Sequence, residues 1–406
     1  MNTFPSESLG NLCSLITDGK HGDCSNADNS GYYFISAKDI RDGRICYENA
    51  RQIIEDDFAE THRRTNLKPG DLLITNSGTI GRLAIASDTE ATAKTTFQKS
   101  VAILKPKQEK ISSSYLYYSL LANKELLINA SSGSVQKNLL LGELRRIAIP
   151  VPPLSTQKGI SMVLSCYDSL IGTNRRRMAL LEESARLLYQ EWFVHLRFPG
   201  HEHIKSHDGL PEGWEKKRIS DIADCVGGAT PSTTVSTYWD DGTITWVTPT
   251  DVTRNTHFVL LETEKKITEA GLNNCSAKML PAHAVLMTSR ASVGFFALAG
   301  REVCTNQGFI SIVPQDITFS YFLLFQLSER VEEIRAMGSG STYPEVSRGK
   351  FREFQVVIPP YRLVTEFDEQ ASFVFKQIRV LKQQNQKLKS ARDILLPRLM
   401  NGEIPV

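Results

Sequence analysis

The sequence lacks the features that mark membrane, disulfide-rich and zinc-bound proteins. Its longest apolar runs, such as VGFFALA from Val293, are far shorter than the roughly 20 residues that a transmembrane helix needs. The seven cysteines are scattered and contain no CxxC pair, which argues against a disulfide framework and against a zinc knuckle. The first twenty residues have no basic start followed by an apolar stretch, so we expect no signal peptide and a cytoplasmic protein.

The sequence also lacks the short motifs of common catalytic sites. We find no GxxxxGK[ST] phosphate loop, no HExxH, no GxSxG and no glycine fingerprint for a nucleotide cofactor. A methyltransferase signature of Asn or Asp before Pro-Pro-aromatic is absent, because IPPY at Ile358 has an aliphatic residue in that position. We therefore expect a chain that is not an enzyme, has no catalytic residue and depends on partners for chemistry.

Charge and histidine content select no single ligand. The net charge of +2 permits a nucleic-acid partner without requiring one, since DNA-binding domains are usually more basic. His201, His203 and His207 form a cluster that suggests a metal, but a solvated linker between domains is the favoured interpretation. We expect no metal site.

One sequence pattern occurs twice along the chain. TNSGTIGRLAIA from Thr75 matches MTSRASVGFFALA from Met287, which sets Gly81 against Gly294. TTFQKSVAIL sets Gln98 against Gln307 of CTNQGFISIV. The offset is 213 residues at the glycines, 209 at the glutamines and a constant 207 from the Gly-Ser turns onward. At that last offset the matched pairs are Gly133 with Gly340, Ser134 with Ser341, Pro152 with Pro359 and Pro153 with Pro360.

Each half predicts a mixed α/β globule. Short β-type runs (DLLIT, RLAIA and SVAILK, then AVLMT, FFALA and FISIV) precede an amphipathic helix and a Gly/Ser turn. Residues 18–70 show little likeness to their counterpart, residues 228–281. The scaffold therefore repeats while long polar loops diverge.

A helical run with an apolar heptad seam follows each double proline. Steps of four and three from Ile160 meet nine non-polar residues in ten, and the same register from Phe367 meets eight in ten. A seam of this length is typical of coiled-coil helices. We expect Pro397 to kink or end the second helix. The predicted seam includes Leu164, Ile171, Asn174, Met178, Leu181, Leu188, Ala371, Ile378, Leu381, Asn385, Leu388 and Leu395.

The two seam asparagines favour an antiparallel pairing of the helices. If Asn174 faces Asn385, Leu181 faces Ile378 and the seams overlap along their whole length. Parallel pairing in equal register would leave both amides without partners, at roughly 1 to 3 kcal/mol each. Antiparallel helices of this length would hold the two globules about 50 Å apart, which suits a bipartite DNA site. The alternative is that each helix only caps its own globule.

The plan of two globules and two helices, with PVPPLSTQ and VIPPYRLVTEF heading the helices, resembles the specificity subunit of type I restriction-modification systems. LPEGWEKKRISDIADCVGGATPS and the closing LLPRLMNGEI add to this resemblance, which covers essentially the whole chain. The second double proline departs from the pattern, because Val364 stands where Gln157 follows the first. The resemblance implies target recognition domains at 1–152 and 213–360, helical spacers at 153–198 and 361–406, and a linker at 199–212.

In that family each globule reads one half of an asymmetric bipartite DNA site. The helices set the spacing and dock two modification (methyltransferase) subunits, and restriction or translocase subunits join a larger complex. The resemblance implies that S-adenosylmethionine, ATP and Mg are bound by partner subunits and not by this chain. The alternatives are a specificity subunit of a related restriction-modification or phage-defence methyltransferase, and a duplicated protein-interaction scaffold without a DNA role.

The polar loops supply the candidate DNA-binding residues. Basic side chains in them can contact phosphates or read guanine, and amides and hydroxyls can contact base edges. The first-half candidates are Lys20, His21, Lys38, Arg41, Arg44, Arg63, Arg64, Gln136, Lys137 and Asn138. The second-half candidates are Thr230, Ser232, Thr233, Thr250, Arg254, Arg290, Tyr343 and Arg348.

Overall fold

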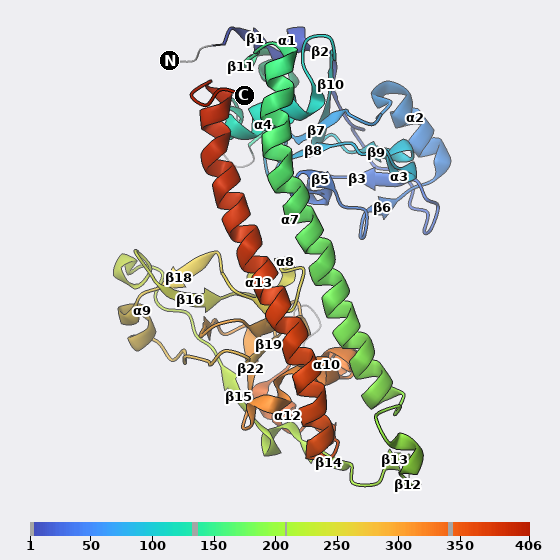
Figure 1. Ribbon diagram of the computed structural model, residues 1–406, viewed down its shortest axis with the longest axis vertical. Coiled ribbons are helices and arrows are strands. Elements are labelled where there is room, and N and C mark those ends of the chain that lie inside the picture. Colours follow the sequence, from blue (N-terminus) through green and yellow to red (C-terminus); the bar gives the residue numbers. More distant parts are fainter. Residues whose placement is uncertain (1–3, 132–136, 208, 340–343) are drawn as a thin grey trace. The chain divides into compact units, whose positions relative to one another are not determined.

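The computed structural model describes residues 4–131, 137–207, 209–339 and 344–406 (Figure 1). The chain forms two compact units, one made of Met1–Leu170 with Lys387–Val406 and the other of Ile171–Gln386. We call them unit 1 and unit 2 and describe each by itself. The predicted match of Gly133 and Ser134 with Gly340 and Ser341 lies outside the described residues.

The main sheet of unit 1 has four antiparallel strands in the order β2-β10-β7-β8. A smaller sheet, β6-β3-β9, and the pair β1-β11 complete it. The apolar runs that predicted strands are buried here, and every residue of β7 is buried. The elements are β1 (Ser6–Ser8), α1 (Leu9–Leu12), β2 (Cys13–Asp18), β3 (Tyr33–Ile35), η1 (Ala37–Asp39), β4 (Ile40–Arg41), β5 (Arg44–Ile45), β6 (Arg51–Gln52), α2 (Glu55–Thr65), β7 (Leu72–Thr75), β8 (Leu83–Ile85), α3 (Glu90–Ala93), β9 (Thr95–Phe97), β10 (Val101–Pro106), α4 (Ser113–Ala122), α5 (Lys124–Asn129), α6 (Leu141–Arg146) and β11 (Ala148–Pro150).

Unit 2 repeats this plan with a main sheet in the order β15-β22-β19-β20-β17 and a smaller sheet β18-β16-β21. The fifth strand, β17, runs parallel to β20. The elements are η2 (Gln190–Val194), η3 (His201–His203), β12 (Ser206–His207), β13 (Leu210–Pro211), β14 (Glu215–Arg218), η4 (Ile219–Asp221), β15 (Ala223–Gly227), η5 (Ser236–Tyr238), β16 (Ile244–Val247), α8 (Pro249–Arg254), β17 (Val259–Leu260), β18 (Lys265–Ile267), α9 (Glu269–Asn273), β19 (Val285–Thr288), β20 (Phe296–Ala299), β21 (Cys304–Thr305), β22 (Phe309–Pro314), η6 (Ile317–Phe319), α10 (Ser320–Glu329), α11 (Val331–Ala336), α12 (Arg348–Arg352) and β23 (Gln355–Ile358).

The internal repeat is confirmed, with one correction of register. Gly81 and Gly294 close the same turn, because their N–H groups donate to Thr75 and Thr288 over 2.9 Å in both cases. The strands β10 and β22 start 208 residues apart, so the counterpart of Gln98 is Asn306 and not Gln307. The backbone hydrogen bonds agree with this match. Gln98 N–H donates to the Ile35 carbonyl at the end of β3, and Asn306 N–H donates to the Val247 carbonyl at the end of β16. The sequence alignment paired Gln98 with Gln307 because the residues are identical, whereas the positions of the strands pair Gln98 with Asn306.

The likeness of the halves extends into the segments whose sequences diverge. β3 pairs in parallel with β9 and antiparallel with β6, and β16 pairs in the same way with β21 and β18. The helices that follow differ, since α2 has 11 residues and α9 has five. The divergent segments thus share a small sheet that their sequences do not reveal.

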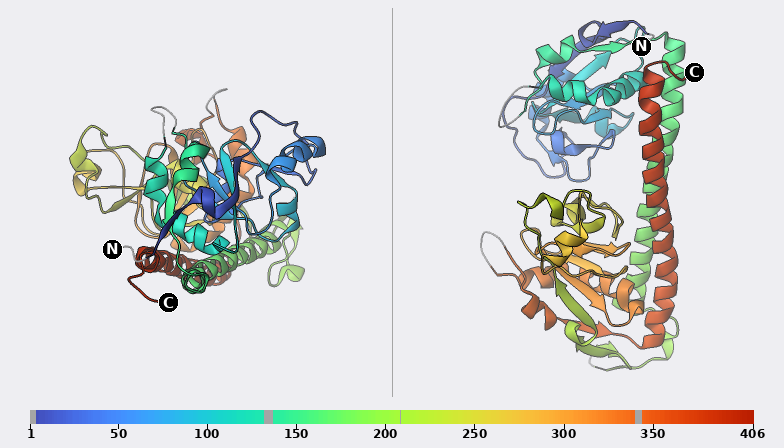
Figure 2. Two further views of the ribbon diagram at one scale, coloured as in Figure 1. Left: turned by 90° about the horizontal axis from the view of Figure 1, so that it is seen from above. Right: turned by 90° about the vertical axis from the view of Figure 1, so that its left-hand side faces the viewer.

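Two long helices, α7 (Leu154–Tyr189) and α13 (Tyr361–Met400), contribute to both units. Within each unit their segments lie side by side and run antiparallel (Figures 1 and 2). In unit 2, Asn174 Nδ2 donates to Asn385 Oδ1 over 2.9 Å, and Asn385 Nδ2 donates to the Ile171 carbonyl. The predicted antiparallel asparagine pair is confirmed.

The seam residues are buried or half-buried throughout, as the heptad pattern predicts. In unit 2, Met178, Ile378 and Leu381 belong to one apolar cluster. In unit 1, Leu164 belongs to the cluster that contains Leu399. Pro397 does not end the helix, because α13 continues through this proline to Met400, and this part of the prediction is wrong. A proline costs the helix one backbone donor, and the residue four positions earlier, Asp393, is exposed to solvent, which can bond its carbonyl.

The turn that starts α7 is tied down by Gln157, which is fully buried. Its Nε2 donates to the carbonyls of Lys110 and Pro152 over 2.9 and 3.0 Å, and its Oε1 accepts from Ser112 N–H. The counterpart Val364 packs in the core of unit 2. The departure from the family pattern at this turn is therefore a difference in core packing.

The predicted helical ranges 153–198 and 361–406 contain α7 and α13, while the compact units cut through both helices. The predicted linker 199–212 contains η3 and the β12–β13 pair. His201 and His203 are exposed. In the described part of the chain, no helix is both long enough and apolar enough to cross a membrane.

Candidate nucleic-acid interface

Three segments meet at one edge of the main sheet in unit 1. Because β2, β10 and β7 are antiparallel neighbours, the end of β2, the start of β10 and the end of β7 share this edge. Backbone bonds join the three: Lys20 N–H donates to Phe97 over 2.8 Å, and Asn76 N–H donates to Ser100 over 3.1 Å. We call this the loop edge.

Unit 2 builds the same loop edge from β15, β22 and β19. Ala229 N–H donates to Thr305 over 2.9 Å, and Ser289 N–H donates to Gly308 over 2.8 Å. These bonds match those of Lys20 and Asn76 in unit 1. The divergent loops of the two halves therefore begin at equivalent positions of their main sheets.

A glycine stands at the start of each divergent loop because the backbones come too close for any side chain. A Cβ atom at Gly19 would lie 1.8 Å from the Phe97 carbonyl oxygen, and one at Gly228 would lie 2.1 Å from that of Thr305. Both distances are far below van der Waals contact. Only glycine permits this crossing of chains, and both halves have it.

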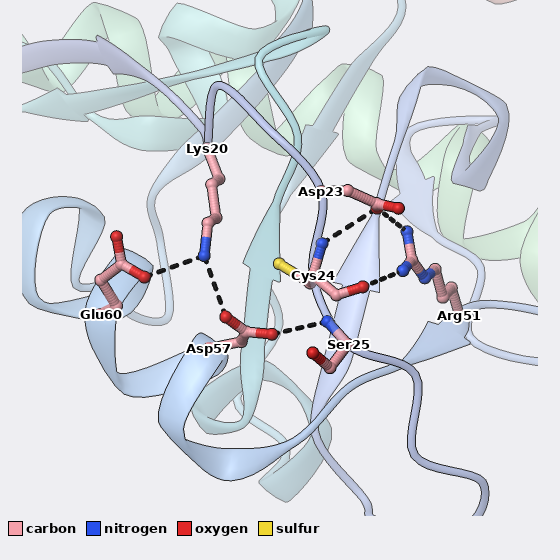
Figure 3. Close-up of polar contacts among 7 residues, drawn as sticks. All are labelled: Lys20, Asp23, Cys24, Ser25, Arg51, Asp57 and Glu60. Carbon is pink, nitrogen blue, oxygen red and sulfur yellow. Dashed lines mark hydrogen bonds and ion pairs between the residues drawn. The ribbon is translucent and has the colours of Figure 1, made fainter.

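Lys20, a predicted DNA contact, is tied into the protein. Its Nζ lies 3.0 Å from Asp57 Oδ1 and 2.9 Å from Glu60 Oε2, both on α2 (Figure 3). These two carboxylates raise the pKa of the ammonium. Ser25 N–H donates to Asp57 Oδ2 over 2.6 Å, and this bond, with the lysine, lowers the pKa of Asp57. Lys20 thus anchors its loop to α2 instead of standing free for phosphate.

Arg51 fixes the next part of this loop. Its guanidinium bonds Asp23 over 2.5 Å and also contacts the Cys24 carbonyl (Figure 3). It contacts the Asn26 side chain as well. His21 and Arg64 are likewise paired, since both lie close to the carboxylate of Asp18, at 2.7 and 3.6 Å. Arg64 also donates to the Asp18 carbonyl. Three of the predicted contact residues at this edge, Lys20, His21 and Arg64, are therefore bonded within the protein.

Four further basic candidates of unit 1 are exposed but lie on other elements. Lys38 is on η1, and Arg41 and Arg44 flank the turn of the β4–β5 hairpin, which bridges to Ala84 in the middle of β8. Arg63 is on the last turn of α2. Over the residues that the structure describes, none of these four has an acidic partner within 4.0 Å, which leaves their charges available to a polyanion.

In unit 2 the divergent loop is held by aromatic and neutral groups. Trp246 Nε1 donates to the Ala229 carbonyl and Trp239 Nε1 to that of Ser232, each over 3.0 Å. The two indoles meet edge to face with centroids 5.0 Å apart. Thr230 Oγ1 donates to Gln307 Oε1 over 2.5 Å. Thr230, Ser232 and Thr233 are exposed, so this edge presents hydroxyl and amide groups.

Two of the predicted arginines join the loop edge of unit 2. Arg290 lies two residues after the end of β19 and pairs with Glu345 over 2.8 Å. Arg348 lies beside the end of β15, because a Cβ atom at Gly227 would lie 3.3 Å from its Nη1. Thr250 and Arg254 lie on α8, whose first residue, Pro249, packs against Gly308 of this edge, and Arg254 pairs with Glu264 over 3.0 Å. Sequence reasoning had grouped these four together.

Some residues of the loop edge were not predicted as contacts. Ser77 forms a β-bridge with the predicted Asn138, and its counterpart Arg290 forms the same bridge with Glu345. Gln98 and Gln307 also lie here, and the repeat alignment pointed to both without marking them as contacts. Lys137 is exposed, whereas Gln136 and Tyr343 lie outside the described residues. Over the residues that the structure describes, no group of three or more His, Cys, Asp and Glu side chains is arranged to hold a metal.

The comparison with protein families decides what kind of chain this is. The model of the type I restriction modification DNA specificity domain matches residues 7–183 and again 211–390. The chain belongs to this family. The two matches also reproduce the internal repeat.

Among curated relatives of this specificity-domain family, the type I restriction enzyme MjaIX specificity subunit of Methanocaldococcus jannaschii is 36% identical over 152 residues, 37% of this chain and 35% of that protein. The HindI specificity subunit of Haemophilus influenzae is 27% identical over 48% of this chain and 42% of that protein. The matches thus span less than half the length of these two relatives. The putative MjaX specificity subunit of M. jannaschii is 23% identical over 94% of this chain and 89% of that protein.

A solved structure shows the same fold. The crystal structure of the type I restriction-modification system S subunit from M. genitalium covers 98% of this chain and 97% of its own, with a TM-score of 0.52 and 15% sequence identity. At that identity the likeness concerns the fold alone.

Proposed function

We propose that the chain is the DNA-recognition subunit of a type I restriction-modification complex, and that each unit reads one half of a bipartite, asymmetric DNA sequence. One observation carries the proposal: the same loop edge occurs twice, with different loops on the same scaffold. Two half-sites that differ in sequence need readers of different chemistry. Lys20, Asp57 and Arg51 fix the first loop, and Trp239 and Trp246 fix the second.

We further propose that the chain supplies recognition and no catalysis. Methylation and cleavage then belong to modification and restriction subunits, which bind S-adenosylmethionine, ATP and Mg. The helices offer a surface for such partners, since large apolar side chains are exposed on them in unit 2. These are Leu180 and Leu187 on α7 and Phe373 and Val380 on α13, between 44% and 71% exposed.

Selection of bound DNA from a random pool tests the function directly. The full chain, produced together with its modification subunits, is expected to enrich two short sequence blocks separated by a spacer of fixed length. Binding should weaken steeply with salt, because phosphate contacts release counterions. A pool without any enriched sequence, or binding that ignores salt, would instead favour a protein-interaction scaffold.

Sequencing of methylated bases in the host, with and without the gene, separates the related alternatives. Loss of one bipartite methylated motif on deletion supports the proposal. Neighbouring genes for a separate methyltransferase and an ATP-driven translocase distinguish a complete type I system from a methyltransferase-only defence system. Persistence of every methylated motif after deletion would contradict both.

A further inference from the structure

The turn that follows the central strand of each main sheet is built in the same way in both units. In unit 1 it spans residues 76–80 after β7, and in unit 2 it spans residues 289–293 after β19. The hydroxyl of Thr75 donates to the Thr79 carbonyl, and that of Thr288 donates to the Ser292 carbonyl. The same hydroxyls accept from Arg82 N–H and Phe295 N–H, each over 2.9 Å. We call these two segments the matched turns.

The tip of each matched turn has a left-handed backbone. Gly78 has φ +75° in the first turn, and Ala291 has φ +57° in the second. Alanine rarely adopts this conformation, yet the second turn keeps the shape without glycine. Ile80 and Val293 are 7% and 6% exposed and anchor the turns to the core. The shape is therefore maintained in two different sequences.

The tips are exposed, small and polar. Gly78 and Thr79 are exposed in the first turn, and Arg290, Ala291 and Ser292 are exposed in the second. Hydroxyl groups and the guanidinium are hydrogen-bond donors of the kind that contact phosphate oxygens. Arg290 bonds Glu345 through Nε, but its side chain is 49% exposed, whereas that of the paired Lys20 is 16% exposed. The exposed tip residues include no large apolar side chain of the kind that anchors protein interfaces.

The matched turns lie at the loop edge, next to the loops that differ between the units. Asn76 N–H and Ser289 N–H bond the segments that precede β10 and β22, and the divergent loops bond those same segments through Lys20 and Ala229. A duplex that touches the divergent loop of a unit thus passes close to the matched turn of that unit.

Two half-sites of different sequence have different bases but the same phosphodiester backbone. An element that is the same in both units cannot account for two different sequences, whereas it suits a ligand that is the same at both sites. We propose that the matched turns bind DNA phosphates and set the register of each unit on the duplex, while the divergent loops read bases. This inference rests on the proposed DNA-recognition function and assigns one contact class to each part of the loop edge.

A charge-neutral pair of substitutions tests the second turn. Replacing Arg290→Gln together with Glu345→Gln removes both members of one ion pair and leaves the net charge unchanged. Binding should weaken equally for all sequences, and the slope of log K against log salt should become shallower by about 0.9. The affinity ratio of parent to variant should then be roughly 3.5-fold smaller at 200 mM than at 50 mM salt. The selected DNA sequence should stay the same.

The matched control is Arg301→Gln with Glu262→Gln. Arg301 and Glu262 form an exposed ion pair of 3.2 Å, and Arg301 follows the end of β20 at the opposite edge of the same sheet. This double variant should keep the affinity and the salt slope of the parent. Thermal unfolding of both double variants shows whether the fold is intact.

A carboxylate placed in each turn tests the symmetry of the two sites. Thr79→Glu and Ser292→Glu occupy equivalent, exposed positions and should each repel a phosphate, with similar losses of affinity for all sequences. Ser87→Glu is the control, because Ser87 is exposed beyond the opposite end of β8. The assay uses the full chain in complex with its modification subunits and a DNA carrying the selected sequence.

The outcomes separate this inference from the function on which it rests. A change in the selected bases of one half-site would show that the turns read sequence and would overturn the inference. Unchanged affinity and slope would also overturn it, and so would lost association with the modification subunit at unchanged DNA affinity. In all three cases the parent complex still selects a bipartite sequence. If the parent selects none, the proposed function itself fails.

Discussion

The divergent loops of the two units differ in what holds them in place. The loop after β2 is fixed by ions, with Lys20 between Asp57 and Glu60 and with Arg51 against Asp23. The loop after β15 is fixed by two tryptophans and by a threonine–glutamine bond. Both start at a glycine in the same backbone crossing. A shared scaffold can therefore present surfaces of different chemistry, which is what two different half-sites require.

The contacts between the helices and the globules differ as well. In unit 1, Asp168 on α7 accepts from Tyr118 over 2.7 Å and pairs with Arg392 on α13. The positions 207 residues away from Tyr118 and Asp168 are Phe325 and Phe375, whose rings lie 6.0 Å apart in unit 2. Unit 2 has its own polar anchor, where Lys382 on α13 donates to Asn255 and Val259 over 2.7 and 2.5 Å. The fold is the same in both units, but the side-chain contacts between helix and globule are different.

The largest expected effect comes from the feature that the two units share. Gly19→Ala and Gly228→Ala should each destabilise the unit that carries it by about 3 kcal/mol, because the added methyl group would overlap a backbone carbonyl. Denaturant unfolding of the full chain measures the loss. The control Gly172→Ala lies on α7, where a Cβ atom meets nothing within 4 Å, and should be neutral or stabilising. Equal stability of all three variants would show that the two backbones at each crossing lie far enough apart to admit a methyl group.

Glu182 should make the stability of unit 2 depend on pH. Burial raises the pKa of Glu182 to about 7, and the carboxylate accepts from Phe258 N–H over 2.8 Å. An unfolded glutamate titrates near pH 4.3, so between about pH 4.3 and about pH 7 the folded state binds more protons than the unfolded state. The contribution of Glu182 to the free energy of unfolding therefore falls as pH rises through this window. His257, 3.8 Å away, acts in the opposite direction, because burial lowers its pKa to about 4.

Glu182→Gln removes this titration. Relative to the parent, the variant should gain on the order of 2 kcal/mol between about pH 5 and about pH 8. Hydrogen exchange of the α7 amides in unit 2 measures the change. Glu183→Gln, on the next residue, serves as control, since the pKa of Glu183 is lowered by its bond to Arg186 and should not produce this trend. Parallel pH profiles for parent and Glu182→Gln would contradict the assignment.

The smallest expected effect separates the ionic loop from the aromatic one. Lys20→Met and Trp246→Phe should each loosen one loop by about 1 kcal/mol through a lost hydrogen bond. Salt should loosen the parent loop at residues 19–25 and leave residues 229–235 unchanged, because only the first is held by charges that ions screen. Hydrogen exchange at low and high salt measures both loops in one sample. If salt changed hydrogen exchange equally in both loops, the loops would not differ in how charges hold them.

The sequence predicted the repeated parts well because they carry periodic signals. The heptad seam and the two asparagines led to the antiparallel pairing, and Asn174 and Asn385 are bonded. The offset of 207 residues holds for α4 and α10 and for the starts of α7 and α13. The predicted helix end at Pro397 was wrong, because a helix tolerates a proline near its end where solvent satisfies the freed carbonyl.

The loop edge was harder to predict because its contacts join residues far apart in the chain. Lys20 and Asp57 are 37 residues apart, and no periodicity links them. A lysine in a polar loop therefore resembled a free phosphate contact, whereas it anchors the loop. Ser77 was missed for the same reason, since it meets Asn138 only through strand order. The basic and polar side chains suggested a nucleic-acid ligand, but only the fold shows which of them are free of partners within the protein.

Exchange of one recognition region tests the central claim, that two dissimilar readers share one scaffold. Residues 1–150 would be replaced by the corresponding region of a related specificity subunit with a different target, and the methylated motif of the resulting complex would be sequenced. The account predicts that one half-site changes to that of the donor while the other half-site and the spacer length remain. A change in both half-sites, or in neither, would contradict it.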